Sequence, residues 1–420
     1  MANSILTNQI ITQESARVLH QKLNFVGNTN VQYDGQYAQT GGKIGASLNV
    51  RMPAKYKARK TATLSVQDHT ERSTPLAVTS QYGVDVSFSS VDRTLSLDMF
   101  SDRIIAPAMA QLAAELEGDC IAEACKYVAN YAGTTSTTMT YKSAMQLGQF
   151  MTEQLAPTTD RSLILTPQSR VEFQDAVKGL FQDQSSIAKQ YRDGMMGRTG
   201  GFDVYENTLI GAQETGTLAG TPLTDGAALG TGVTNANTFV SQTTVQINGA
   251  TSGTTLKAGD VITFGTVANG VVDCHPETKR TLGRLKKFVV QDDVTLTTAA
   301  TSYAVTVKPG LIYGDGNAFQ NCILTNANTD NMAVTKFGDA GTSYAQDLAF
   351  HKDAFLFATV DLEDVSGKGA KGARAVVDGI SIRMAEQYNI TDDRFVTRFD
   401  VLFGFAPLYP ELASRHFSAL

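Results

Sequence analysis

The sequence has little charge and no tryptophan. Lys and Arg number 35 and Asp and Glu number 41 among 420 residues, so the formal net charge is −6. Charged residues make up 18 % of the chain, against about 25 % in an average soluble domain. Affinity for phosphate backbones comes from a cationic excess, so the missing positive charge argues against a dedicated nucleic-acid binder. A hydrophobic content of 42 % at this low charge excludes disorder as the main state.

Cysteine is scarce as well. Four cysteines are too few and too scattered for a disulfide framework, and we interpret all of them as buried or free thiols of a reducing compartment: Cys120, Cys125, Cys274 and Cys322. The N-terminal residues lack the basic start and apolar core of a signal peptide. No stretch approaches about 18 uninterrupted apolar residues, the length that spans a bilayer. We therefore expect a protein that is made in a cytoplasm, has no membrane segment and is not secreted.

Signatures of catalysis are missing too. The five histidines stand in no HExxH or other metal-binding spacing, and no GxSxG elbow or phosphate loop with its lysine occurs. Cys274 and His275 are adjacent, which we interpret as a solvated turn rather than a ligand pair. The Asp-Asp pairs at 292–293 and 392–393 lie in turn contexts, where Asp commonly closes an Asx turn. We expect no enzymatic activity, no cofactor and no metal.

The strongest pattern that is present predicts a helix over residues 101–130. Its apolar side chains recur every three or four positions: Ile105, Met109, Leu112, Leu116, Cys120, Ala124 and Val128. Pro107 should kink this helix or mark its first turn. At 1.5 Å per residue it would be roughly 40 Å long, a spine rather than a domain-sized helix. Shorter helices are expected after the N-cap Thr12, around residues 145–155, and from the cap and N1 proline at 166–167.

Two regions favour strands. Residues 43–88 alternate apolar and polar side chains at both ends, which predicts a long two-stranded excursion with a basic distal part. Such a hairpin is marginal alone in water, so it must lie on its own core or on a neighbouring chain. Residues 212–336 are dense in Thr, Gly, Asn and Ala and predict an all-β insertion, with strands at 240–247, 261–264, 288–296 and 303–307. Two more strands, 381–390 and 395–405, flank the second Asp-Asp turn.

Basic residues gather in two places. The denser run comprises Arg51, Lys55, Lys57, Arg59 and Lys60. One interpretation is an electrostatic contact with an acidic surface of another subunit; the other is a solvated hairpin tip. A glycine-rich loop further along carries Lys368, Lys371 and Arg374 and is open to the same two interpretations.

Three stretches carry a family likeness. They read KIGASLNVRMP at 43–53, QDLAFHKDAF at 346–355 and FDVLFGFAPLYPE at 399–411. In this order they resemble the major capsid (coat) proteins of tailed bacteriophages, which have the HK97-like fold. GGFDVYEN at 200–207, which precedes the β-rich region, looks like the coat branch of short-tailed phages that carries an inserted I-domain. The order of the motifs along the chain makes the resemblance specific.

The resemblance implies an α+β fold of the HK97-like kind and supplies names for its parts. Residues 1–42 would be the N-arm and residues 43–88 the extended E-loop. The peripheral domain, with its long spine helix, would combine 89–135 with 381–420. The axial domain would combine 136–211 with 338–380, and the inserted I-domain would span 212–337.

The resemblance also implies a structural protein of the virion. The subunit would self-assemble into pentamers and hexamers of an icosahedral shell around double-stranded phage DNA, in the cytoplasm of a bacterial host. Its partners would be other copies of itself, a scaffolding protein and a portal, with loose non-specific contact to packaged DNA and none to a membrane. Some relatives cross-link Lys to Asn beside a buried Glu. Nothing in the sequence places such a pair against Lys55, Lys57 or Lys60, so we expect no cross-link.

Two alternatives remain at this point. The first is the shell protein of a cellular encapsulin-type nanocompartment, which has the same fold and encloses a cargo enzyme. The second, of another class, is a β-rich adhesin or glycan-processing enzyme centred on residues 212–336. The absence of Trp and the scarcity of paired acids in that segment disfavour the second.

Overall fold

The computed structural model describes most of the chain, and the chain divides into two compact units. The described residues are 8–33, 47–59, 61–64, 66, 72–89, 101–136, 138–177, 197–226, 229, 233, 238–297, 302–314, 318–326, 329–363, 365–366 and 369–419. Unit 1 comprises Met1–Val50, Ser73–Ile121 and Lys352–Leu408, and unit 2 comprises Arg51–Arg72, Ala122–His351 and Tyr409–Leu420. Each unit joins segments that are far apart in the sequence, so neither could be delimited from local composition.

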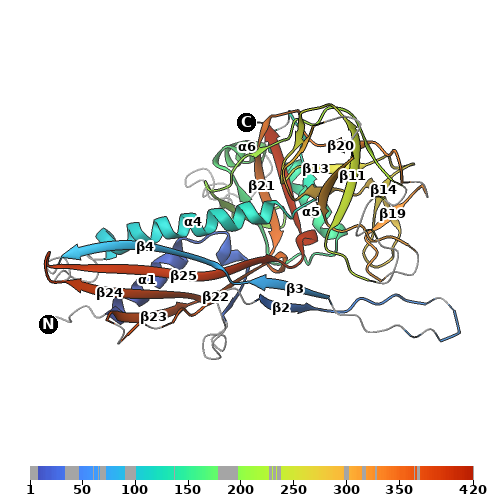
Figure 1. Cartoon of the computed structure of the whole chain (residues 1–420). Coiled ribbons are helices and arrows are strands. Elements are labelled where there is room, and N and C mark those ends of the chain that lie inside the picture. The colour runs from blue at the N-terminus through green and yellow to red at the C-terminus, as the bar shows by residue number, and fades with distance from the viewer. Residues whose placement is uncertain are drawn as a thin grey trace. The chain divides into compact units, whose positions relative to one another are not determined.

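Unit 1 is built on a sheet of long strands (Figure 1). The order is β1-β22-β25-β24-β23, and β4 also pairs with β25. The strands are β1 Asn30–Tyr33, β4 Ser80–Ser89, β22 Phe355–Val360, β23 Lys371–Val377, β24 Ile380–Asn389 and β25 Arg394–Pro407. The predicted strands at 381–390 and 395–405, and the turn between them, are confirmed. Asp393 in that turn has a φ of 48°, a backbone conformation that Asp tolerates better than most residues.

Two helices belong to this sheet. Helix α1, Asn8–Lys22, packs against β23 and β24 and buries Ile11, Ala16 and Leu19. It begins four residues before the predicted cap, because Thr12 lies inside it and donates its hydroxyl to the carbonyl oxygen of Asn8 at 2.6 Å. Helix α4, Ala106–Cys125, follows a π-helical turn, Ser101–Ile105, and runs along β4 and β25 in Figure 1. The predicted spine is confirmed with Pro107 in the first α-helical turn, but it ends at Cys125 and not at residue 130.

The predicted excursion at 43–88 is divided in the structure. Strands β2, Ser47–Met52, and β3, Arg72–Ala77, form a separate two-stranded sheet. Strand β4 instead pairs with β25, where Phe88 lies opposite Phe395 with ring centroids 5.9 Å apart. The alternation of β4 was visible in the sequence, but its partner lies far along the chain and only folding brings the two together.

Unit 2 contains a mixed sheet covered by helices α5, Tyr141–Glu153, and α6, Pro167–Val177. Its order is β5-β26-β21-β6-β8-β7, and β9 also pairs with β21. The strands are β5 Tyr131–Ala132, β6 Arg161–Leu165, β7 Arg198–Thr199, β8 Phe202–Glu206, β9 Gln213–Glu214, β21 Ser343–His351 and β26 Ala413–Ala419. The core joins Leu147 of α5, Phe173 of α6 and Phe202 of β8. Helix α6 starts as predicted, since Thr166 accepts from the Ser169 amide.

The remaining strands of unit 2 form what we call the β-rich segment, residues 220–336. One sheet has the order β10-β11-β18-β16-β13-β20, beside the smaller sheets β12-β17 and β15-β14-β19. The strands are β10 Gly220–Thr224, β11 Thr243–Ala250, β12 Thr254–Leu256, β13 Val261–Phe264, β14 Val271–Cys274, β15 Thr281–Leu285, β16 Phe288–Val290, β17 Val294–Leu296, β18 Tyr303–Lys308, β19 Cys322–Leu324 and β20 Val334–Lys336. The predicted strand at 288–296 is two strands, β16 and β17.

Short 3-10 turns complete the elements: Val26–Asn28, Lys352–Ala354 and Pro410–Leu412. Helices and strands are thus both abundant. The sheets combine local hairpins with pairings between strands that are far apart in the sequence. The α+β class predicted from the sequence is confirmed.

Candidate assembly surfaces

The basic run predicted as an interface follows strand β2. Arg51, the fifth residue of β2, is exposed, and so are Lys55 and Arg59 in the irregular stretch that follows. Lys57 is half-buried. Lys60 lies outside the described residues. The run therefore offers cationic side chains at its surface, and its role in assembly stays a prediction.

A lysine from the β-rich segment lies close enough to this run to be affected by it. Lys279, in the turn between β14 and β15, donates to the carbonyl oxygens of Ala318 and Gln320 at 2.9 Å each. Burial together with the charges of Lys55 and Lys57 lowers the pKa of Lys279 to about 8. Sequence reasoning missed Lys279, because no local pattern relates residue 279 to residues 55 and 57.

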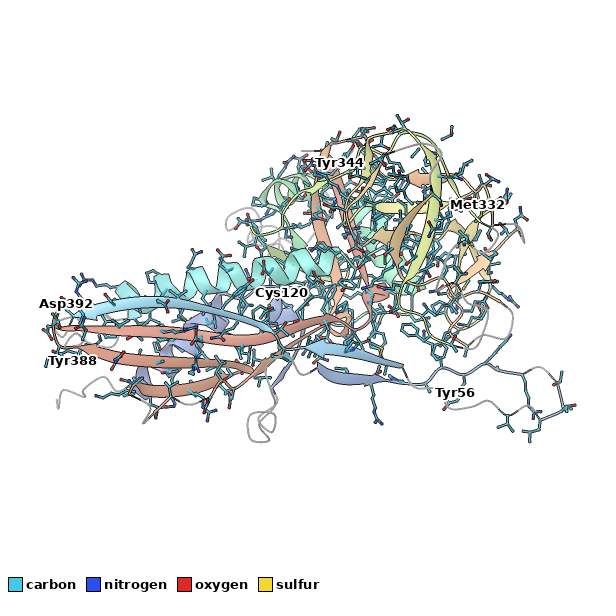
Figure 2. The ribbon with its side chains drawn as sticks, viewed as in Figure 1. Tyr56, Cys120, Met332, Tyr344, Tyr388 and Asp392 are labelled. Carbon is cyan, nitrogen blue, oxygen red and sulfur yellow. The ribbon has the colours of Figure 1, made fainter. Side chains whose placement is uncertain are left out.

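The same excursion also exposes apolar side chains. Tyr56, Leu64 and Val66 have exposed fractions of 62 %, 74 % and 82 %. Figure 2 shows Tyr56 on the extended stretch beyond β2. Large apolar groups in water next to cations are a common composition for a surface that a partner covers.

The second basic group lies in unit 1. Lys368 is outside the described residues, and Lys371 is exposed at the first position of β23. Arg374 on the same strand forms an ion pair with Asp361 at 3.2 Å. The two predicted basic groups thus belong to different compact units.

The end of the β24–β25 hairpin is a second exposed apolar surface. Tyr388, Ile390 and Val396 are 47 %, 83 % and 51 % exposed. The Tyr388 hydroxyl donates to Asp393 at 2.9 Å, and its ring lies 5.0 Å from that of Phe395. Figure 2 shows Tyr388 and Asp392 at this end of the strands. The sequence predicts only strands and a turn for these residues; the available signal is the apolar Ile390 two residues before the acidic pair at 392–393.

The residues considered for chemistry have structural roles. All four cysteines are buried thiols outside any disulfide, as predicted. Cys274 lies in β14, so the prediction that it forms a solvated turn with His275 is wrong for the cysteine. His275 does start a turn, since its Nδ1 accepts from the amides of Glu277 and Thr278 at 3.2 Å each. Within the described ranges, no three His, Cys, Asp or Glu side chains cluster as metal ligands, and no helix is long and apolar enough to cross a membrane.

The comparison with protein families identifies one match. The model of the P22 coat protein, gene protein 5, matches residues 6–418. This match spans both compact units and the β-rich segment. No curated protein matches the sequence.

Several solved structures are similar to this one at low sequence identity. A chain of Mycobacterium phage Che8 is 9 % identical with a TM-score of 0.45, over 94 % of this chain and 90 % of that one. A chain of the mature capsid of bacteriophage PhiM1 is 10 % identical with a TM-score of 0.42, over 94 % and 87 %. A virus-like particle from Pyrococcus furiosus is 7 % identical with a TM-score of 0.35, over 97 % of each chain.

Proposed function

Because the chain belongs to the P22 coat protein family, we propose that it is a major capsid subunit that assembles into pentamers and hexamers of an icosahedral shell around double-stranded phage DNA. The family match over residues 6–418 is the observation that carries this proposal, and it confirms the resemblance to phage coat proteins. In the proposal the subunit's partners are its own copies, a scaffolding protein and a portal. Its contact with packaged DNA is loose, and it assembles in the host cytoplasm before it becomes part of the virion.

The surfaces described above support a subunit that is completed by neighbours. Exposed apolar side chains stand on the excursion after β2 and at the end of the β24–β25 hairpin. One heterologous contact repeated around closed symmetry produces rings and shells. Summed over many copies, such interfaces hold a particle together although each contact is modest.

Within this proposal the segments keep the assignments that the resemblance implied. The N-arm is 1–42, the E-loop 43–88, and the peripheral domain 89–135 with 381–420. The axial domain is 136–211 with 338–380, although β22 and β23 of its second part lie in the sheet of unit 1. The β-rich segment is the core of an I-domain at 212–337.

Electron microscopy of the assembled protein tests the proposal. The full chain is produced with the scaffolding protein encoded beside it and, as a control, alone. We expect closed shells of uniform size by negative stain when both proteins are present, and vertices that resolve as pentamers. A chain that stays monomeric at high concentration with its scaffold present would overturn the proposal.

The alternative to the proposed function is the shell protein of a cellular nanocompartment. Neighbouring genes for a portal and a terminase are expected for a phage coat protein. A neighbouring gene for a peroxidase or a ferritin-like cargo, together with shells that enclose that enzyme, would favour the encapsulin-type shell.

A further inference from the structure

Lys287, between strands β15 and β16, holds its ammonium group against two aromatic rings. Its Nζ lies 3.8 Å from the centroid of the Tyr131 ring and 4.4 Å from that of Phe150. It also donates a hydrogen bond of 2.7 Å to the backbone oxygen of Tyr131. Tyr131 belongs to β5 and Phe150 to α5, which both lie outside the β-rich segment. This side chain therefore fastens the β-rich segment to the rest of unit 2.

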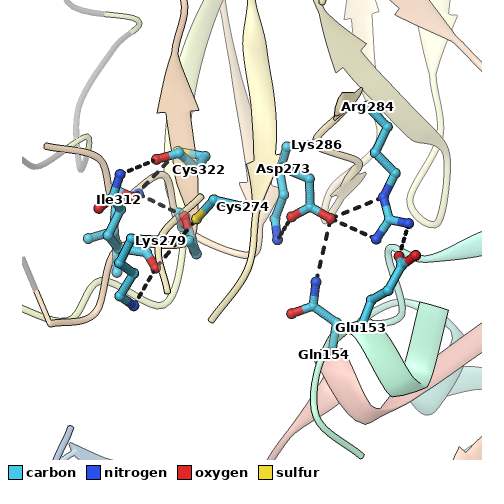
Figure 3. A network of polar contacts seen from close by, with 12 residues as sticks. Glu153, Gln154, Asp273, Cys274, Lys279, Arg284, Lys286, Ile312 and Cys322 are labelled. Atoms are coloured by element: carbon cyan, nitrogen blue, oxygen red, sulfur yellow. Dashed lines mark hydrogen bonds and ion pairs between the residues drawn. The ribbon is translucent and has the colours of Figure 1, made fainter. Parts of the chain in front are cut away.

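An ionic network lies beside this contact, and Figure 3 shows its members. Asp273 of β14 accepts from Lys286 Nζ at 2.9 Å and from Arg284 Nη2 at 2.9 Å. Arg284 also pairs with Glu153 at the end of α5, and Gln154 donates to Asp273 at 3.5 Å. Burial opposes ionisation of Asp273, but Lys286 and Arg284 lower its pKa below the ordinary value.

The positive charges of Lys287 and its neighbours outnumber the negative ones. Arg284, Lys286 and Lys287 supply three positive charges, while Asp273 and Glu153 supply two negative ones, and both acids already bind Arg284 or Lys286. Among the contacts of the described residues, Lys287 reaches a carbonyl and two rings but no carboxylate. The Arg284 guanidinium lies 4.7 Å from the centroid of the same Phe150 ring, and its positive charge repels the Lys287 ammonium group.

Burial, reinforced by the charge of Arg284 and opposed by Asp273 and Glu153, lowers the pKa of Lys287 to about 7. Two neighbours have pKa values displaced away from neutrality: burial lowers that of Lys286, but Asp273 outweighs it and raises the pKa, and Lys286 and Arg284 lower the pKa of Asp273. The phenol of Tyr131 stays neutral, since burial raises its pKa. Lys287 is thus the group in this cluster whose charge changes near neutrality.

We propose that Lys287 makes the packing of the β-rich segment against β5 and α5 sensitive to pH near neutrality. The neutral amine fits a site in which the charges of Arg284 and Lys286 are matched by those of Asp273 and Glu153. The protonated amine adds an unmatched charge, which its two aromatic neighbours compensate only in part. The packing of the β-rich segment against β5 and α5 therefore becomes less stable as the pH falls and more stable as the pH rises. This inference goes beyond the proposed capsid function and does not depend on assembly.

The sign and size of the effect follow from proton linkage. In the open or unfolded chain a lysine titrates near 10.4, so between about pH 7 and pH 10 the open state binds more protons than the closed one. The stability of this packing therefore rises with pH across that window. The opening constant falls by at most about tenfold per pH unit, the limit for one proton.

Hydrogen exchange of the full unassembled chain at pH 6.5, 7.5 and 8.5, corrected for intrinsic amide rates, tests the proposal. In the wild type we expect the opening constant of peptides covering 281–290 to fall as the pH rises. Lys287→Met should remain protected at every pH, because its side chain has similar length and no charge. In Lys287→Arg the same peptides should exchange rapidly at every pH, because the arginine charge is permanent. Lys142→Met, at an exposed lysine of α5, is the matched control and should follow the wild type.

The same pH profile in Lys287→Met as in the wild type would overturn the proposal. A second measurement covers the case in which a variant does not fold. Carbon NMR of the wild-type chain labelled at lysine Cε should contain one resonance that titrates near pH 7. Titration of every lysine near its ordinary pKa would also overturn the proposal.

Discussion

At the scale of single residues, Asp400 of β25 shows how a buried charge is accommodated. It is fully buried and accepts from Arg383 Nη2 and Arg398 Nε at 2.6 Å each. Gly83 on the neighbouring strand β4 leaves the necessary room, since a Cβ there would lie 2.5 Å from Asp400 Oδ1. The two arginines differ, because the Arg383 side chain is 14 % exposed and that of Arg398 is 54 % exposed.

We therefore predict that substitutions of Asp400 and Arg398 lower the free energy of unfolding by unequal amounts. Asp400→Ala leaves the Arg383 guanidinium buried without its carboxylate and should lower the free energy of unfolding by about 3–5 kcal/mol. Arg398→Ala removes a solvated partner and should cost only about 0–1 kcal/mol. Urea unfolding of the full chain measures both. Equal losses in the two variants would contradict the assignment of Arg383 as the buried partner.

At the scale of elements, Glu117 attaches the segment after α1 to the spine helix α4. It is 2 % exposed, and its carboxylate accepts the backbone N–H of Phe25. The Phe25 ring packs against Phe355 and Phe405, with centroids 5.8 and 6.1 Å away. Burial raises the pKa of Glu117, while the amides of Phe25 and Asn24 oppose the rise.

Glu117→Leu should be more harmful than Glu117→Gln. Leucine leaves the buried N–H of Phe25 without an acceptor, which costs about 1–3 kcal/mol, whereas glutamine keeps a carbonyl oxygen in place. The raised pKa adds a pH dependence: the stability contributed by Glu117 is present at pH 4 and is lost as the pH rises through its folded-state pKa. Urea unfolding at pH 5 and 7.5 should show wild type losing more stability than Glu117→Gln on going to the higher pH. Parallel losses would contradict this role of the carboxylate.

At the scale of the whole molecule, the low charge of the sequence bears on association. A subunit with a net charge of −6 repels its copies weakly, and the cations of the run at 51–60 are concentrated on one excursion. An acidic surface on a neighbouring subunit would attract this run, and salt would weaken that attraction because the Debye length falls from about 10 Å at 0.1 M to about 3 Å at 1 M.

Reversing two charges of this run should therefore impair assembly. For Lys55→Glu with Lys57→Glu we expect the critical concentration for shells to rise by about tenfold or more, since 1.4 kcal/mol per contact is a factor of ten. Sedimentation of the assembly reaction measures the shell fraction. Lys142→Glu, at an exposed site on α5, is the control, and circular dichroism checks that each monomer is folded. Unchanged assembly in the double variant would leave the solvated hairpin tip as the correct interpretation.

Much of the secondary structure could be predicted, and the candidate surfaces only in part. Periodicity revealed the spine helix, the hairpin that turns at Asp393 and the strands near 240–247, 261–264 and 303–307, but it missed β14 and β15. It could not show that Phe88 lies opposite Phe395, because strand alternation carries no information on the partner strand. It also missed the exposed apolar group at Tyr388 and Ile390, since exposure depends on which faces other elements cover.

By itself, the sequence determined the kinds of element and their order, and its motifs pointed to the family that the match over residues 6–418 then established. These properties are local, because helix and strand periods and turn residues act between near neighbours. The tertiary structure alone decided which ionisable groups lose contact with water. Lys287 reads as one more surface lysine beside Lys286, yet folding places it against Tyr131 and Phe150. Desolvation and charge depend on neighbours in space, so the low overall charge with which the sequence began says nothing of where a single charge matters.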